Sequence, residues 1–186
     1  MEYFKKLVGE KVYLSPRSIE DAEKYAEWLN DFQVTDYTGK TTTTITVPGE
    51  VEYLKNNINN TASFGIVTLG SDKLIGSTSL EHFEPENRSA CFGIFIGDEE
   101  YRNKGYGTEA TRLILDFGFN YLNIHSIWLN VIECNERAIK CYQKCGFNEC
   151  GRRRDAKFVN GKYYDLLIME ILEDNFNDSF IRNKNI

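Results

Sequence analysis

The chain lacks the features that would place it in a membrane or outside the cell. No apolar run reaches the roughly 18 residues expected of a membrane-spanning helix, and the opening residues Met1–Lys6 do not resemble a signal peptide. No repeat, linker or compositional break divides the 186 residues, a length that suits one domain. We therefore expect one cytoplasmic domain over residues 1–186, with its core at about 11–172 and a mobile, Asn- and Asp-rich tail at 173–186.

The chain also lacks an even set of cysteines. Its five cysteines are an odd number, which argues against a disulfide framework. Four of them fall within residues 134–150, so a structural zinc site has to be considered. Zinc sites usually pair cysteines about two to four positions apart, and here the outer two would have to converge from neighbouring elements. We expect no metal and free cysteines that pack as small hydrophobes: Cys91, Cys134, Cys141, Cys145 and Cys150.

The chain has fewer basic than acidic residues. The chain has 22 Lys and Arg against 28 Asp and Glu, a formal net charge of −6. A nucleic-acid partner would need a basic footprint, so this balance argues against one. Negative charge near a cleft would instead attract an amine or a polyamine.

A glycine-containing loop, Tyr101–Ala110, is the most informative segment that is present. It follows an apolar, strand-like run, Cys91–Ile96, and opens a segment of helical periodicity, Thr108–Tyr121. Two glycines two residues apart allow a tight turn without a Cβ to block a ligand. Backbone N–H groups converge at such a helix start and favour an anion, so a phosphate-bearing cofactor is expected.

The loop alone fits more than one occupant. Gly105-x-Gly107-x-x-Ala110 matches the dinucleotide fingerprint, with Glu133 as its acid, although that fingerprint normally follows its strand directly. Arg102-x-x-Gly105-x-Gly107 matches a loop that cradles the pyrophosphate of coenzyme A. A tight turn that binds nothing is the third interpretation.

A second segment, Asn135–Phe147, decides in favour of coenzyme A. It resembles the N-x-x-A-x-x-x-Y-x-K-x-G-F segment of the GCN5-related N-acetyltransferase (GNAT) superfamily, as the glycine loop resembles that family's pyrophosphate loop. Asn135 suits a helix N-cap, and Gly146 suits the position after the helix. The resemblance covers about residues 11–172 and is greatest to the ribosomal-protein N-terminal and spermidine/spermine acetyltransferase branch.

The resemblance implies acetyl-CoA as co-substrate, an amine as acceptor, and a set of cofactor-binding residues, while charge and the lack of a long apolar run argue against a nucleic-acid or membrane partner. The sequence sets no oligomeric state, and a homodimer is plausible. The implied cofactor-binding residues are Phe95, Ile96, Gly97, Arg102, Asn103, Lys104, Gly105, Tyr106, Gly107, Thr108, Asn135, Ala138, Tyr142 and Lys144.

The family's chemistry assigns further roles. The family stabilises the reaction's oxyanion with a backbone N–H just before the glycine loop, here that of Phe95 or Ile96, and a bulge at Gly93 or Gly97 would free this amide. Tyr142 is expected to hydrogen-bond or protonate the departing thiolate.

The general base stays open among four residues and water. Glu81, His82 and Glu84 end a predicted strand, and Asp36 lies where polyamine-acetylating relatives carry an acid. Glu81 and Asp36 are the catalytic candidates carried forward beside Tyr142.

Periodicity and turn signals predict the following elements. Strands are expected at 11–14, 63–69, 73–82, 90–96, 126–132, 147–158 and 162–171, and helices at 22–30, 48–60, 108–121 and 136–144, with a loop or frayed strand at 31–47. The second helix should bury Val51, Leu54 and Ile58, and Asn160-Gly161 predicts a hairpin. The fold class is α/β: a mixed, mostly antiparallel sheet with flanking helices and one splayed parallel strand pair.

Two other functions remain open at this point. One is a non-catalytic acyl-CoA-binding module, because fold alone does not establish function. The other is a nicotinamide-dependent oxidoreductase that uses the Gly105–Ala110 fingerprint.

Overall fold

The computed structural model describes residues 2–38, 41–57 and 62–177, and these form one eight-stranded sheet. The strand order is β1-β2-β3-β4-β5-β6-β8-β7, and every neighbouring pair is antiparallel except β5 and β6, which are parallel. The predicted fold class is thereby confirmed. The strands are β1 (Leu7–Val8), β2 (Val12–Pro16), β3 (Ser63–Thr68), β4 (Leu74–Glu84), β5 (Ser89–Ile96), β6 (Ser126–Ile132), β7 (Asn148–Val159) and β8 (Lys162–Leu172).

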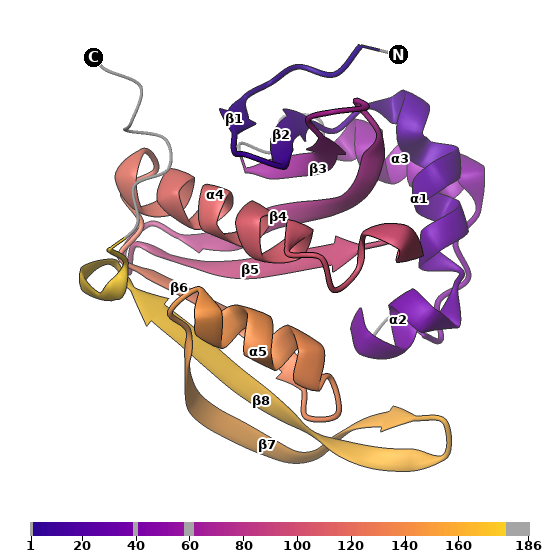
Figure 1. The fold of residues 1–186 in the computed structure, drawn as a ribbon. Helices are drawn as coiled ribbons and strands as arrows, with labels where there is room; N and C mark the ends of the chain where they lie inside the picture. The colour runs from indigo at the N-terminus through magenta and orange to yellow at the C-terminus, as the bar shows by residue number, and fades with distance from the viewer. Residues whose placement is uncertain (1, 39–40, 58–61, 178–186) are drawn as a thin grey trace.

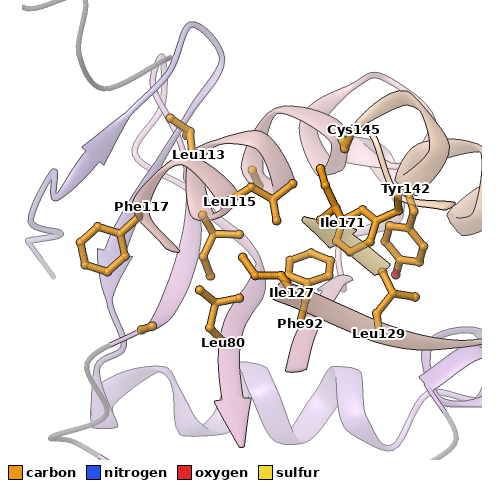
Figure 2. Close-up of a cluster of buried hydrophobic side chains, with 14 of the residues drawn as sticks. Leu80, Phe92, Leu113, Leu115, Phe117, Ile127, Leu129, Tyr142, Cys145 and Ile171 are labelled. Carbon is orange, nitrogen blue, oxygen red and sulfur yellow. The ribbon is translucent and has the colours of Figure 1, made fainter. Parts of the chain in front are cut away.

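Helices cover the sheet on both faces (Figure 1). One core lies beneath α4 and α5, where Leu113, Tyr142 and Ile127 belong to a single buried cluster (Figure 2). A second core lies beneath α1 and α3, around Tyr25 and Trp28. The helices are α1 (Ala22–Leu29), α2 (Phe32–Thr38), α3 (Val47–Asn56), α4 (Tyr106–Asn120) and α5 (Glu136–Lys144). No helix in residues 2–38, 41–57 and 62–177 is long and apolar enough to cross a membrane.

Helix α2 contradicts the predicted loop at 31–47. Asp31 starts it: its carboxylate accepts from Gln33 N at 2.9 Å, and its carbonyl accepts from Thr35 N at 2.9 Å. The β-branched residues of this segment have low helix propensity, which hid the helix from the sequence pattern. Packing decides the outcome, because Val34 is buried in the α1–α3 core.

Two predicted helix boundaries move as well. Helix α4 begins at Tyr106, two residues before the predicted Thr108, because Gly105 takes the N-cap position. Helix α3 ends at Asn56, and the predicted core position Ile58 lies outside the described residues. On α3, Leu54 is buried as expected, whereas Val51 is half-buried.

Part of the predicted mobile tail is packed against the domain. Glu173 forms an ion pair with Arg88 at 2.6 Å, and the Phe176 ring lies 5.2 Å from that of Phe119. The rest of the tail prediction falls on residues 178–186, outside the described residues. The hairpin at Asn160-Gly161 is confirmed, with both residues at positive φ, 47° and 78°, as a tight two-residue turn requires.

Candidate active site

The parallel strands β5 and β6 separate after three residue pairs. Ser89–Cys91 pair with Ser126–Trp128, and beyond Cys91 the two strands no longer pair. Strand β5 stays paired to β4 as far as Ile96, and β6 stays paired to β8 over its whole length. The second half of β5 therefore turns its β6 side toward an opening in the sheet.

Hydrogen bonds at both ends of β5 show which amides point into this opening. Ser126 N donates to Arg88 O at 3.2 Å, so even-numbered residues face β6. Gly97 N donates to Ile75 O at 2.9 Å, so odd-numbered residues face β4. By the alternation of an antiparallel ladder, the N–H of Ile96 points into the opening and that of Phe95 does not.

The expected bulge is absent at Gly93, whereas Gly97 N and Asp98 N both donate to Ile75 O, at 2.9 and 3.2 Å, as in a β-bulge just beyond Ile96. The β4–β5 register runs without a shift from Gly76↔Ile96 to Glu81↔Cys91. The Ile96 amide is therefore freed by the divergence of β6. Packing also requires a glycine at position 97, because a Cβ there would overlap the Trp28 ring.

The glycine loop has the local geometry of an anion cradle. Asn103 (φ 61°) and Gly105 (φ 87°) both adopt left-handed conformations that turn the chain into α4. Gly107 does not have a left-handed conformation, and a Cβ there would lie 3.6 Å from Ile96 Cγ1, an ordinary contact. The fold would thus admit a side chain at Gly107, and its absence keeps the space in front of the first-turn amides open.

The Arg102 side chain donates hydrogen bonds to the backbone at the end of β5. Its Nε donates to Ile96 O at 3.1 Å and its Nη2 donates to Gly97 O at 2.7 Å. These bonds attach the loop to the end of β5.

Helix α5 forms the opposite wall. Asn135 Oδ1 accepts from Ala138 N at 3.2 Å, the predicted N-cap. At the other end Gly146 (φ 97°) donates to Gln143 O at 3.1 Å, and Phe147 N donates to Tyr142 O at 3.1 Å. These paired bonds are those of a Schellman C-cap, so the predicted role of Gly146 is confirmed.

Tyr142 lies at the edge of the buried cluster in Figure 2, with 9% of its surface exposed. Its ring packs edge-on against Phe92, with centroids 5.9 Å apart. Burial raises the pKa of the Tyr142 hydroxyl well above its usual value, although Arg137 opposes the shift. The hydroxyl therefore keeps its proton at neutral pH and is available as a hydrogen-bond donor.

A cavity of about 880 Å³ runs along these walls and continues to the α1–α3 side of the sheet. Such a volume is in the range of small-molecule and cofactor sites. Among the predicted residues it is lined by Glu81, Phe95, Ile96, Arg102, Asn103, Gly105, Gly107, Thr108, Asn135, Ala138, Tyr142 and Lys144.

Six predicted residues do not line the cavity. Among the cofactor candidates, Gly97 contacts Trp28, whereas Lys104 and Tyr106 face Lys11 on the outer side of the loop. The other three were candidate bases: Asp36, His82 and Glu84. Glu84 accepts from the Asn87 side chain at 3.0 Å in an exposed turn.

The far end of the cavity is built by β4 and β5. Ser77, Ser79 and Glu81 alternate along β4 and share one face. Ser79 Oγ donates to Glu81 Oε1 at 2.8 Å, and opposite Ser79 stands Gly93, which contributes no side chain. This face turns toward α1, because Phe95, paired with Ser77, packs 6.4 Å from the Tyr25 ring.

The sequence did not predict the other residues of this end. Arg17 lies over the Tyr25 ring, 5.7 Å from its centroid, and donates to Ser77 Oγ. Glu50 is only 5% exposed and shares a face of α3 with Leu54, four residues on, which is the signal that was available in the pattern. Other lining residues of this end are Leu29, Gln33, Val34, Tyr37, Thr38 and Tyr53.

Two cavity-lining cations of α5 were also missed. Arg137 and Lys140 precede Lys144 at helical spacing, so the helical period of the segment would have shown them on the predicted cofactor side. They place positive charge beside the glycine loop, in a chain of net charge −6.

A pair of thiols sits between α4 and α5. Cys141 Sγ lies 3.2 Å from Thr108 Oγ1, and Cys145 Sγ lies 3.6 Å from Thr108 O. The pKa of Cys141 is lowered, chiefly because its thiolate accepts a hydrogen bond from the Cys145 thiol and, against the effect of burial, because of a hydrogen bond with Thr108. The pKa of Cys145 is raised, so the negative charge of the pair rests on Cys141.

The geometry disfavours the dinucleotide interpretation. Glu133, its expected acid, accepts from Asp165 N at 2.8 Å and pairs with Arg152 at 3.5 Å. It is therefore engaged by the β7–β8 hairpin, and it does not line the cavity.

Comparison with known proteins agrees with the coenzyme A interpretation. The model of an acetyltransferase (GNAT) domain matches residues 11–148. The spermidine N(1)-acetyltransferase of Vibrio cholerae is 36% identical over 129 residues, which are 68% of this chain and 74% of the relative. The probable N-acetyltransferase YjcK of Bacillus subtilis is 29% identical over 182 residues, 89% of this chain and 96% of the relative.

A solved structure shows the same architecture. The crystal structure of spermidine N-acetyltransferase from Vibrio cholerae in complex with CoA and spermine matches with a TM-score of 0.82 and 27% identity. The match covers 91% of this chain and 100% of that one. The chain therefore belongs to the acetyltransferase (GNAT) family, and the protein is an acetyl-CoA-dependent N-acetyltransferase.

Proposed function

We propose that the protein acetylates a primary amine of a small molecule that enters from the α1–α3 side of the sheet. The observation that carries this proposal is one cavity that reaches from the glycine loop, past the opening beside β5, to the polar wall of Ser77, Ser79 and Glu81. Cofactor and acceptor can thus approach one another from opposite faces of the sheet.

The cofactor end suits acetyl-CoA. Amides at the start of α4 would bind the pyrophosphate, with Gly107 leaving room for it. Arg137, Lys140 and Lys144 would add positive charge for the phosphates. Asn135 and Ala138 would line the pantetheine arm. When bound, acetyl-CoA supplies the acetyl thioester.

Glu81 is the best-placed base for the acceptor. An aliphatic amine is mostly protonated at neutral pH and has to lose a proton before it can attack the thioester. Glu81 is the only one of the four candidate bases that lines the cavity, and its Oε2 accepts no hydrogen bond from the described residues. It would hold the ammonium group and take the proton directly or through water.

Two donors would then serve the transition state. The Ile96 N–H points into the opening and would stabilise the negative charge that develops on the carbonyl oxygen. The Tyr142 hydroxyl would donate to the departing sulfur. Its raised pKa favours hydrogen-bond donation over complete proton transfer.

Spermidine is the first acceptor to test. Two of the similar proteins are named spermidine N-acetyltransferases. In this chain the acceptor end carries the carboxylates of Glu50 and Glu81 and the partly exposed rings of Tyr37 and Tyr53, all of which attract cationic amines.

A panel of amines tests the proposal. Purified protein and acetyl-CoA are incubated with spermidine, spermine, an aromatic amine and a peptide with a free N-terminus, and acetylated product is measured by mass spectrometry. The proposal expects multiple turnovers with at least one small primary amine. Tight acetyl-CoA binding without transfer to any amine would instead indicate a non-catalytic acyl-CoA-binding module.

A further inference from the structure

The turn between β1 and β2 is held against the cofactor loop by one side chain of α4. Glu109 Oε1 accepts from three successive backbone amides: Glu10 N at 2.6 Å, Lys11 N at 2.8 Å and Val12 N at 3.2 Å. A carboxylate satisfied by several N–H groups forms strong, charge-assisted hydrogen bonds. Gly9 completes the fit, because a Cβ there would collide with the same carboxylate.

A second contact joins this turn to the glycine loop itself. Lys11 Nζ donates to Lys104 O at 3.1 Å and lies 5.8 Å from the centroid of the Tyr106 ring. The Tyr106 ring packs edge-on against Tyr101, with centroids 5.2 Å apart. The outer side of the loop is therefore in contact with the turn at Lys104 and Tyr106.

The cofactor-binding amides lie between two anchors. Arg102 fixes the loop to the end of β5 on one side. The Glu109 and Lys11 contacts fix it on the other side, and neither residue lines the cavity. Asn103 sits between these anchors in a left-handed conformation, which in a non-glycine residue costs free energy that the surroundings have to offset.

We propose that Glu109 and Lys11 are positioning residues for acetyl-CoA binding, which hold the glycine loop in its binding conformation through the β1–β2 turn. Amides that are already in place bind an anion more tightly than amides that must first be ordered. The proposal rests on the proposed function only in that the loop binds acetyl-CoA. Binding can be measured without any acceptor, so failure to find an amine substrate leaves the test intact.

The first test is equilibrium binding of acetyl-CoA to Glu109→Ala, Glu109→Gln and Lys11→Met, with Glu27→Ala as a control that removes a surface carboxylate of α1 (64% exposed). We expect Glu109→Ala to raise the Kd at least about tenfold, with kcat at saturation within about twofold. Lys11→Met should raise the Kd for acetyl-CoA by a smaller factor. Glu109→Gln should partly rescue binding, because its amide oxygen still accepts hydrogen bonds.

A purely structural role predicts a different pattern. The melting temperature of Glu109→Ala would fall while the Kd of the folded protein stayed at the wild-type value, and this result would overturn the proposal. Should Glu109→Ala not fold, Lys11→Met decides, because it leaves the carboxylate and its three hydrogen bonds in place.

Hydrogen exchange of residues 10–12, compared with that of amides in the core, provides a readout that separates local coupling from global stability. Coupling between two sites is reciprocal, so acetyl-CoA should slow exchange of the amides of residues 10–12 in the wild type. This protection should be smaller in Lys11→Met, and partly retained in Glu109→Gln, at temperatures where both variants remain folded. Unchanged exchange at residues 10–12 on binding to the wild type would contradict the coupling.

Discussion

The two ends of the cavity are built by different means. The cofactor end comes mainly from backbone in two contiguous segments, the loop at 102–108 and the first turn of α5. The acceptor end comes from side chains on separate elements, among them Arg17, Glu50 and Glu81. A backbone-built site needs only a few glycines and caps, so it leaves a short pattern in the sequence. A site built from dispersed side chains leaves no contiguous motif, so that Glu81 was a candidate from the sequence and Arg17 was not.

The largest expected effect is at the cofactor end, from Gly107→Val. A branched side chain there would occupy the space in front of the α4 amides, so acetyl-CoA affinity should fall by about a hundredfold or more, ~2.7 kcal/mol. Gly70→Val is the matched control, because nothing lies within 4 Å of a Cβ at Gly70. Calorimetric titration measures the acetyl-CoA affinity of both variants. An affinity of Gly107→Val within about twofold of wild type would contradict a role of the loop in binding acetyl-CoA.

Tyr142→Phe should have the next largest effect, at the junction of the two ends. Its interaction with the departing sulfur exists mainly in the transition state, so kcat and kcat/KM should fall together by at least about tenfold. Acetyl-CoA affinity should hardly change, because the ring remains. Tyr121→Phe, at an exposed tyrosine, is the control. Wild-type kcat in Tyr142→Phe, with only a lower melting temperature, would reduce Tyr142 to a packing residue.

Glu81→Gln probes the acceptor end. The amide keeps the shape and can still accept from Ser79, but it neither attracts an ammonium group nor takes its proton. The kcat/KM for spermidine should fall about tenfold, and the salt dependence of KM should weaken. Glu84→Gln removes the same charge outside the cavity and should leave steady-state kinetics unchanged. Equal effects of the two variants would point to net charge rather than to a site.

Arg102→Ala should cost less than Gly107→Val. The guanidinium holds the loop to Ile96 O and Gly97 O, and the cradle itself consists of main-chain groups. We expect a rise in the Kd for acetyl-CoA of about three- to tenfold, which corresponds to the loss of one or two hydrogen bonds. A loss as large as that of Gly107→Val would mean that Arg102 itself binds the phosphates.

Cys141→Ser should have the smallest effect on turnover, within about twofold, because the hydroxyl can keep the contact with Thr108. The wild-type thiol is nevertheless informative. Because its pKa is lowered, alkylation of Cys141 by iodoacetamide should reach its maximal rate at a lower pH than alkylation of Cys150, whose pKa is raised. Bound acetyl-CoA should slow the reaction. Peptide mapping checks this, and faster labelling of the exposed Cys150 at pH 7 would contradict the assigned charge.

Much of the fold was predictable because its signals are local. Asn135 and Gly146 cap α5 as their residue types predict, and Asn160-Gly161 makes the expected hairpin. Helix α2 was missed because its residues favour other conformations and only packing of Val34 makes it helical.

The same holds for the site: residues in local motifs were predictable from the sequence, and residues brought together only by the fold were not. The sequence named Gly105, Gly107 and Tyr142 as cofactor-binding residues because each lies in a short motif, and all three line the cavity. It also named Gly97, whose neighbour in space is Trp28, about 70 residues away in the chain. Helical spacing with Leu54 could have marked Glu50 as a buried acid, but not its place in the site, since only the assembled fold brings α3 to the face that carries Glu81.

The central claim is that one cavity holds acetyl-CoA at a backbone-built end and an amine at a side-chain-built end. The most direct measurement determines the Kd for acetyl-CoA and the KM for spermidine in parallel for wild type, Gly107→Val and Glu81→Gln. The account predicts that Gly107→Val weakens acetyl-CoA binding, whereas Glu81→Gln raises the spermidine KM and leaves the acetyl-CoA Kd within about twofold. A change of both constants by the same factor in Glu81→Gln would contradict it.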